Sequence, residues 1–400
     1  MAVATQTKPA SPAPITVTLS PAARTPVADM TAPTLEPIVA TPTPALPFDQ
    51  ELAMRVRQEV ERSIQRSIKG LEYFNSPDPA VGLTPKDVIH SRGTLKLYHY
   101  RAQADEVYRV PILLVMSLVS KPYILDLVPG QSLVEFLLQR GFDVFMIDWG
   151  TPRPEDSRLT LEDYVLDFIP QCIAKVQEAS GEPDVSLVGY CMGGLLSTLY
   201  AATHPDGPLK NLACFATPVN YEGMGLQRQW ADPRYFDVDR IVDTLGNVPP
   251  EMMSQSFDML RPVSKAISQV RLWDNMWNDE QTRAFRLFDR WGADQIPFAG
   301  ETFRQTTKDL MWANKLVKGE MTVGGRAAKL ESITVPVLHV LAEHDHIVPA
   351  AAAKDFVEMV GSADKKEIVM KGGHVSLVAG GNAMFRLWPQ LDRWLAERSV

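Results

Sequence analysis

The stretch that decides the fold of this chain is VSLVGYCMGGLLSTLYAAT, residues 185–203. Its apolar run at 185–189 predicts a buried strand, and residues 193–203 predict a helix, so the chain reverses direction around Cys191. The run Gly-Tyr-Cys-Met-Gly matches the G-x-nucleophile-x-G elbow, with Cys where Ser is commoner. Glycines let such a turn pass close to neighbouring strands, because they carry no side chain. The pattern predicts that Cys191 is a nucleophile held above the edge of a sheet.

A cysteine on a tight turn can also be purely structural, so its context decides between the two interpretations. Cys191 stands directly between a predicted strand and a predicted helix, and the positive end of the helix dipole favours a thiolate there. The other two cysteines differ, since Cys172 lies within a predicted helix and Cys214 within an apolar strand. We expect Cys191 to be reactive and the other two to be inert core residues.

The segments around the elbow alternate between apolar runs and helical periodicity. The further strands predicted are 110–119, 144–148, 212–219, 335–342 and 367–370, and the further helices are 132–139, 159–178, 350–360 and 384–398. Strands joined by helical crossovers form a mainly parallel, doubly wound sheet. The predicted fold class is therefore α/β, of the α/β-hydrolase type.

The same alternation of predicted strands and helices divides the chain into a tail, a core in two parts and a cap. Residues 1–48 hold ten of the 31 prolines among Ala and Thr and are predicted to be a disordered tail. Residues 49–219, which open with an amphipathic helix, and residues 330–400 form the two parts of the hydrolase core. Residues 220–329 interrupt the alternation and are predicted to be a largely helical cap. The aromatic residues of this cap either form its core or line a channel for an apolar acyl group.

Two residues downstream of the elbow are predicted to complete a catalytic triad. Asp345 follows the strand at 335–342, and His374 follows the next strand after two glycines. Elbow enzymes present nucleophile, acid and histidine in this chain order, at the carboxyl ends of strands. His374 is expected to act as the base, and Asp345 to hold its tautomer.

Other residues near these positions are expected to support the triad or the bound substrate. His346 is adjacent to Asp345, but neighbours in an extended segment point to opposite sides, so we expect His346 to support a triad residue or to contact the substrate. A metal site at 344–346 is a further alternative, although no other ligand cluster accompanies it. For an oxyanion hole, two backbone N–H groups are needed. We expect one from Met192 and the other from Val119 or from Ser120.

Composition excludes several classes of function. The net charge of -8 argues against nucleic acid as the main partner. Three sparse cysteines fit a reducing compartment, and no apolar run reaches the length of a membrane span. The N-terminus lacks the pattern of a secretory signal. We expect a cytoplasmic protein.

Further segments resemble the polyhydroxyalkanoate synthases, most closely the short catalytic subunit of class III. Besides GYCMGG, these segments are KPYILDL (121–127), IDWG (147–150), ATPV (216–219), VDTLGNVP (242–249), GETFRQ (300–305), DHIVP (345–349) and GGH (372–374). They extend over most of the chain from about residue 48. Class IV synthases are similar in length and use a different partner.

The resemblance implies an acyltransferase in which Cys191 carries the acyl group, with His374 and Asp345 completing the triad. It implies short-chain (R)-3-hydroxyacyl-CoA substrates such as 3-hydroxybutyryl-CoA, and a polyester product. No cofactor is expected, because CoA belongs to the substrate and is released as a product. A non-catalytic partner subunit and association with polymer granules are also implied. Two alternatives stay open: a cysteine hydrolase similar to dienelactone hydrolase, and a non-catalytic scaffold on granules.

Overall fold

The computed structural model describes residues 50–400 of the chain. The chain divides into two units, Met1–Val56 and Arg57–Val400, and the predicted tail at 1–48 lies outside the described residues. The first described element is the helix α1 (Gln50–Asn75), which lies where the N-terminal amphipathic helix was predicted. No helix within residues 50–400 combines the length and apolarity that crossing a membrane requires.

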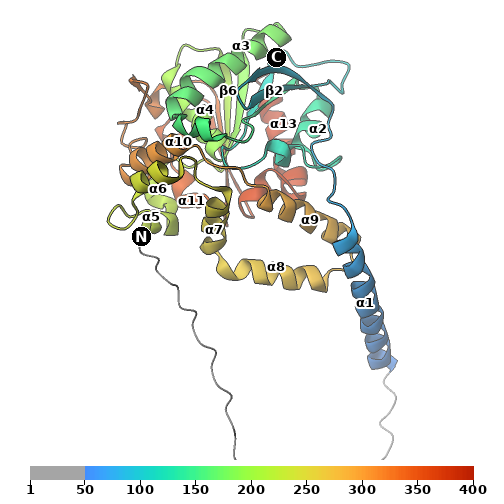
Figure 1. The fold of residues 1–400 in the computed structure, drawn as a ribbon. Helices are drawn as coiled ribbons and strands as arrows, with labels where there is room; N and C mark the ends of the chain where they lie inside the picture. The colour runs from blue at the N-terminus through green and yellow to red at the C-terminus, as the bar shows by residue number, and fades with distance from the viewer. Residues whose placement is uncertain (1–49) are drawn as a thin grey trace, which may run out of the picture. The chain divides into compact units, whose positions relative to one another are not determined.

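A sheet lies among the helices of the fold, with β2 and β6 labelled in Figure 1. It has eight strands, in the order β1-β2-β4-β3-β5-β6-β9-β10. The strands are β1 (Lys86–Arg92), β2 (Leu95–Tyr100), β3 (Ile112–Val115), β4 (Val144–Asp148), β5 (Val185–Tyr190), β6 (Leu209–Phe215), β9 (Val337–Ala342) and β10 (Lys365–Met370). The strands from β4 to β10 in this order are parallel, whereas β2 pairs antiparallel with both of its neighbours, β1 and β4. The predicted fold class is confirmed.

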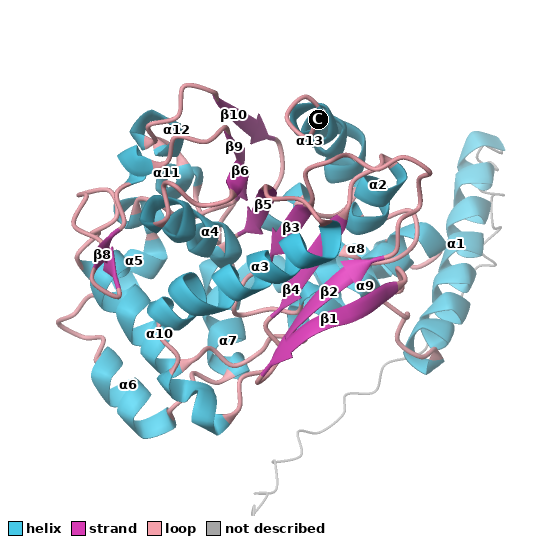
Figure 2. Ribbon diagram, turned by 90° about the horizontal axis from the view of Figure 1, so that it is seen from above, coloured by secondary structure: helices cyan, strands magenta, loops and turns pink. Residues whose placement is uncertain are grey.

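Helices cover both faces of this sheet (Figure 2). The helices α3 (Ile169–Ser180) and α4 (Met192–Thr203) lie on one face, and α2 (Leu133–Gln139) and α13 (Trp388–Ala396) on the other. Every residue of α4 after Met192 is buried, which explains why its sequence is apolar or small all round. The helix after the elbow is thus packed inside the core, and this packing also fixes the position of the elbow.

The segment between β6 and β9, which contains the predicted cap, is largely helical. Its helices are α5 (Leu226–Trp230), α6 (Val238–Leu245), α7 (Pro250–Leu260), α8 (Pro262–Asp274), α9 (Asp279–Ala293) and α10 (Gly300–Gln305), followed by a hairpin of β7 (Thr322–Val323) and β8 (Arg326–Ala327). Trp291 and Phe298 are buried, whereas Trp273 and Trp277 are about half exposed. The interpretation as cap core therefore holds for only part of the aromatic residues.

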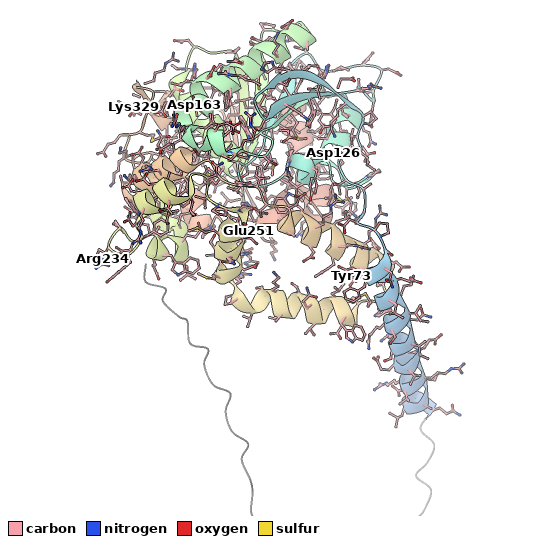
Figure 3. The ribbon with its side chains drawn as sticks, in the orientation of Figure 1. Tyr73, Asp126, Asp163, Arg234, Glu251 and Lys329 are labelled. Atoms are coloured by element: carbon pink, nitrogen blue, oxygen red, sulfur yellow. The ribbon has the colours of Figure 1, made fainter. Side chains whose placement is uncertain are left out.

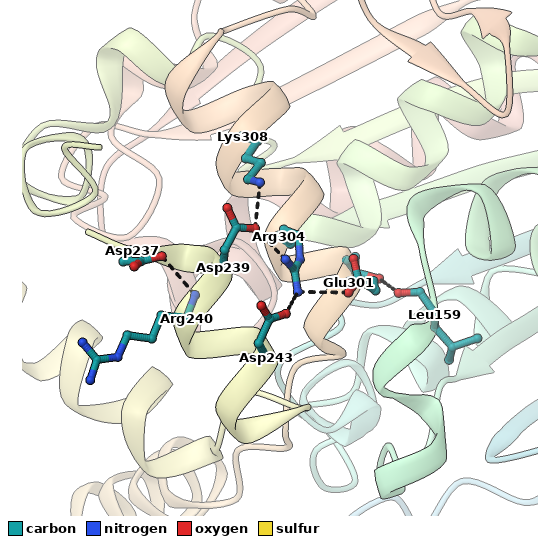
Figure 4. A network of polar contacts seen from close by, with 9 residues as sticks. Leu159, Asp237, Asp239, Arg240, Asp243, Glu301, Arg304 and Lys308 are labelled. Atoms are coloured by element: carbon teal, nitrogen blue, oxygen red, sulfur yellow. Dashed lines mark hydrogen bonds and ion pairs between the residues drawn. The ribbon is translucent and has the colours of Figure 1, made fainter. Parts of the chain in front are cut away.

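Arg304 links two of these cap helices (Figure 4). Its guanidinium on α10 pairs with Asp239 and Asp243 of α6, each at 2.5 Å, and Lys308 reaches the same Asp239 at 2.7 Å. The GETFRQ segment thus has a structural role in this chain. It ties α6 to α10 through these ion pairs.

Several predicted boundaries were wrong, each for a local reason. The strand expected at 110–119 ends at Val115, because the next residues leave the sheet as a loop. The helix expected at 350–360 is two short helices, α11 (Ala350–Ala353) and α12 (Phe356–Met359), because Asp355 takes a left-handed φ of 73°. The hairpin of β1 and β2 was not predicted at all.

Candidate active site

Cys191 occupies a strained turn between β5 and α4. Its φ of 56° and ψ of -122° are uncommon for a residue that has a Cβ atom. The Cys191 N–H donates to the carbonyl of Phe215 at 2.8 Å, which fixes the turn against the end of β6. The residue is 9% exposed. The turn has the geometry expected of a nucleophile elbow.

The glycines around Cys191 are required by close approach of the backbone. A Cβ on Gly193 would lie 2.0 Å from the carbonyl oxygen of Val115, and one on Gly194 would lie 1.9 Å from the Thr217 hydroxyl. A Cβ on Gly189 would also lie 2.6 Å from a backbone atom. A side chain at any of these three positions would clash with its surroundings, which explains why the elbow carries glycine there.

Asp345 and His374 meet at the same edge of the sheet. Asp345 lies just beyond the end of β9, and His374 begins the turn after β10. The His374 Nδ1 atom is 2.7 Å from Oδ2 of Asp345, and both side chains are buried. The other carboxylate oxygen, Oδ1, accepts the N–H groups of Ile347 at 2.8 Å and Val348 at 2.9 Å. The carboxylate is therefore held from both sides.

The charges around the imidazole favour its protonated form. Burial of His374 opposes its charge, but the Asp345 carboxylate and the charge of the nearby Cys191 sulfur together raise its pKa to about 10. The ring of Tyr190 lies against the imidazole, with 4.9 Å between centroids, and its hydroxyl donates to the His374 carbonyl at 3.4 Å. The structure thus brings Cys191, His374 and Asp345 together.

The two predicted oxyanion donors flank the elbow. Met192 is the first residue of α4, and Val119 lies in the loop after β3. The Val119 carbonyl accepts from Ile296 at 3.2 Å, and Ser120 forms a bridge with Gln295. Within residues 50–400, neither the Met192 nor the Val119 N–H donates a backbone hydrogen bond. Both groups are free to bind a carbonyl oxygen, and that role stays a prediction.

His346 lies beside the triad at the wall of a cavity. It is half-buried, and its Nδ1 atom has no hydrogen-bond partner among the described residues. The cavity has a volume of about 720 Å³, and α7, α8 and α9 supply most of its walls. Glu251 of α7 and Lys265 of α8 line it (Figure 3 labels Glu251). Burial, followed by the charge of Arg261 in the same wall, lowers the pKa of His346.

Two features of this region were not apparent from sequence. The packing of Tyr190 on His374 joins residues from two strands, and the only signal was the position of Tyr190 inside the elbow motif. No pattern marked Arg261 as a wall of the cavity. Conversely, the alternative metal site at 344–346 finds no support, since His344 is exposed while Asp345 is buried.

The other two cysteines match the expectation of inert residues. Burial raises the pKa of Cys172 and that of Cys214 to about 12. Cys214 is also held between Thr198 at 3.5 Å and the carbonyl of Gly194 at 3.8 Å. Neither thiol is in a setting that favours a thiolate.

Comparison with known proteins first identifies the class. A profile of the alpha/beta hydrolase fold matches residues 122–380. A soluble variant of monoglyceride lipase from Saccharomyces cerevisiae, solved in complex with a substrate analog, aligns over 81% of this chain and 100% of its own, with 16% identity and a TM-score of 0.51. The chain is thus an α/β-hydrolase-fold protein.

More specific matches define the family. A profile described as "Poly-beta-hydroxybutyrate polymerase (PhaC) N-terminus" matches residues 72–137. The protein named "Poly(3-hydroxyalkanoate) polymerase subunit PhaC" in Haloferax mediterranei is 38% identical over 80% of this chain and 65% of its own length. The protein of that name in Allochromatium vinosum is 35% identical over 86% of this chain and 98% of its own. The chain belongs to the poly(3-hydroxyalkanoate) polymerase family of acyltransferases, which confirms the resemblance found in the sequence.

Proposed function

We propose that this chain polymerises short-chain (R)-3-hydroxyacyl-CoA, such as 3-hydroxybutyryl-CoA, into a polyester through a thioester on Cys191. The observation that carries the proposal is the elbow cysteine beside a histidine whose Nδ1 lies 2.7 Å from a buried carboxylate. A thiolate attacks a thioester without a large change in free energy, and the enzyme thioester formed remains an activated acyl donor. A serine ester would be a poorer donor to a further hydroxyl.

In the first step, the Cys191 sulfur attacks the thioester carbonyl of the substrate. The oxyanion that forms is bound by the N–H groups of Met192 and Val119. The carbon–sulfur bond to CoA breaks, and the departing thiolate takes a proton from His374. Asp345 keeps the His374 Nδ1–H oriented throughout, so that Nε2 faces the reacting atoms.

In the second step, the hydroxyl of one acyl unit attacks the thioester carbonyl of the other. The hydroxyl proton passes to His374, a new ester bond forms, and the Cys191 thiolate is released for the next cycle. Repetition extends the polyester by one unit and releases one CoA each time. The helical cap over residues 220–329 keeps water from the thioester, and His346 and Arg261 at the cavity wall contact the incoming CoA thioester.

We further propose a non-catalytic partner subunit of the class III type and a place at the surface of cytoplasmic polymer granules. The relatives of similar length are named as the PhaC subunit of their polymerase, which supports a multi-subunit enzyme. Co-purification from polymer-forming cells tests the partner. A chain that purifies alone with full polymerising activity would contradict it.

The test of the reaction compares CoA release and polymer formation from (R)-3-hydroxybutyryl-CoA. The wild type and Cys172→Ala should both release CoA and form an insoluble polyester, while Cys191→Ala should do neither. Free 3-hydroxybutyrate as the sole product would instead identify a hydrolase. Polymer formation that survives Cys191→Ala in cells would indicate a scaffold or another nucleophile.

A further inference from the structure

Tyr221 is a buried tyrosine, 4% exposed, that interacts with the charge of Cys191. Its hydroxyl group makes no hydrogen bond within the described residues. Buried polar groups in native proteins almost always have a partner, so an unpaired phenol near a nucleophile needs an explanation. Tyr190, the other phenol beside Cys191, already donates to the His374 carbonyl. Of the two phenols, only that of Tyr221 thus lacks a hydrogen-bond partner among the described residues.

The backbone holds Tyr221 firmly in this position. Its N–H donates to the side-chain oxygen of Asn314 at 2.9 Å, and the Asn314 amide donates to Asn220 at 2.9 Å. The N–H groups of Val219 and Asn220 both donate to the carbonyl of Ala352, at 2.9 and 2.8 Å. A side chain that starts from so well-bonded a backbone is pre-organised for recognition.

Tyr221 also approaches the nucleophile from a defined side. It follows β6, whereas Val119 of the proposed oxyanion hole follows β3, and β5 with its elbow runs between these two strands. Burial, and then the charge of the nearby Cys191 sulfur, raise the pKa of the Tyr221 phenol far above its usual value. The phenol therefore stays protonated and can donate a hydrogen bond.

We propose that the Tyr221 hydroxyl donates a hydrogen bond to the oxygen on the third carbon of the acyl unit bound to Cys191. The inference rests on the proposed function, and it adds a residue that recognises the 3-hydroxyacyl class. The carbonyl oxygen of that unit faces the N–H groups on the β3 side, so the oxygen on the third carbon is the polar atom left for the β6 side. A site built to pair with a substrate hydroxyl discriminates against an analogue that lacks it, because its own polar group is then left unpaired.

The test measures single-turnover acylation of Cys191, followed as CoA release, with two substrates. With (R)-3-hydroxybutyryl-CoA, Tyr221→Phe should lower the acylation rate about tenfold, the effect of one lost hydrogen bond. With butyryl-CoA, which lacks the 3-hydroxyl, the rate should stay within about twofold of the wild type. Tyr100→Phe is the matched control, because it removes another buried, unpaired phenol from the distant strand β2.

The outcomes separate a failure of the Tyr221 inference from a failure of the proposed function. Equal losses with both substrates, or no loss with either, would overturn the role of Tyr221 while leaving Cys191 acylation intact. If Tyr221→Phe does not fold, the wild type alone tests the inference. Its Cys191 should be acylated about tenfold faster by (R)-3-hydroxybutyryl-CoA than by butyryl-CoA. Equal rates with the two substrates would overturn the inference. A wild type that is acylated at Cys191 by neither substrate would overturn the proposed function, and this inference with it.

Discussion

Replacing Asp345 by asparagine tests the triad most sharply, because the structure dictates how the new amide must point. In the wild type, Oδ1 accepts the N–H groups of Ile347 and Val348, and Oδ2 faces Nδ1 of His374 at 2.7 Å. An asparagine at this position keeps its side-chain oxygen on the Ile347 and Val348 N–H groups. In the opposite orientation its NH₂ group would face these two N–H groups, and no atom there could accept a hydrogen bond. Its NH₂ group must then point at Nδ1 of His374.

This orientation forces the wrong tautomer on His374. An NH₂ group that donates to Nδ1 leaves the ring proton on Nε2, so the imidazole can no longer accept a proton from Cys191. The loss of the carboxylate also removes the main charge that raises the His374 pKa against its burial. We expect the acylation rate to fall by about 10³- to 10⁴-fold, as in triads whose aspartate is replaced by asparagine. The hydrogen-bond count is kept, so stability should fall only through the lost charge interaction between position 345 and His374.

The assay follows CoA release from (R)-3-hydroxybutyryl-CoA together with the melting temperature of each variant. Asp345→Ala serves as a contrast, because it leaves the Ile347 and Val348 N–H groups unpaired and should cost about 1–3 kcal/mol of stability for each. An Asp345→Asn enzyme that kept more than about a tenth of the wild-type rate, with the wild-type pH profile, would refute this reasoning.

Three further predictions concern the elbow, the histidine and the thiols. Gly193→Ala should destabilise the fold by about 1–3 kcal/mol through its backbone clash, while Gly292→Ala, with open space around its Cβ, should be neutral or slightly stabilising in urea unfolding. The His374 pKa of about 10 lies above the ordinary 6.5, so its stabilisation is complete below about pH 6.5 and is lost as pH rises through about 10. The free energy of unfolding should fall across that window, and His374→Gln should flatten the fall; parallel curves would contradict the assignment. Brief iodoacetamide treatment and peptide mapping should label the elbow cysteine before Cys172 or Cys214, and prior labelling of either would argue against its activation.

The elbow and the triad could be predicted because short local sequence motifs mark their residues. Glycines flank Cys191 because a Cβ at these positions would meet the backbone of β3 or α4 or the Thr217 side chain. Asp345 and His374 follow strands that the apolar pattern also marked. Parallel strands bring such positions to one edge, so chain order was enough to place them.

Other parts of the site depend on contacts that no local pattern records. Tyr221 is fixed by Asn314, a residue 93 positions away, and neither position carried a signal. The hairpin of β1 and β2 has a mixed burial pattern, which weakened its alternation. Which cap aromatics are buried was equally unpredictable, because helical periodicity does not tell which helices pack together.

The most direct measurement of the central claim is mass spectrometry of the full chain stopped soon after mixing with (R)-3-hydroxybutyryl-CoA. Peptide mapping should place a hydroxyacyl adduct on Cys191 alone, and the adduct should disappear in Cys191→Ala and accumulate far more slowly in Asp345→Asn. An adduct on another residue, or rapid CoA release by Cys191→Ala, would contradict the account.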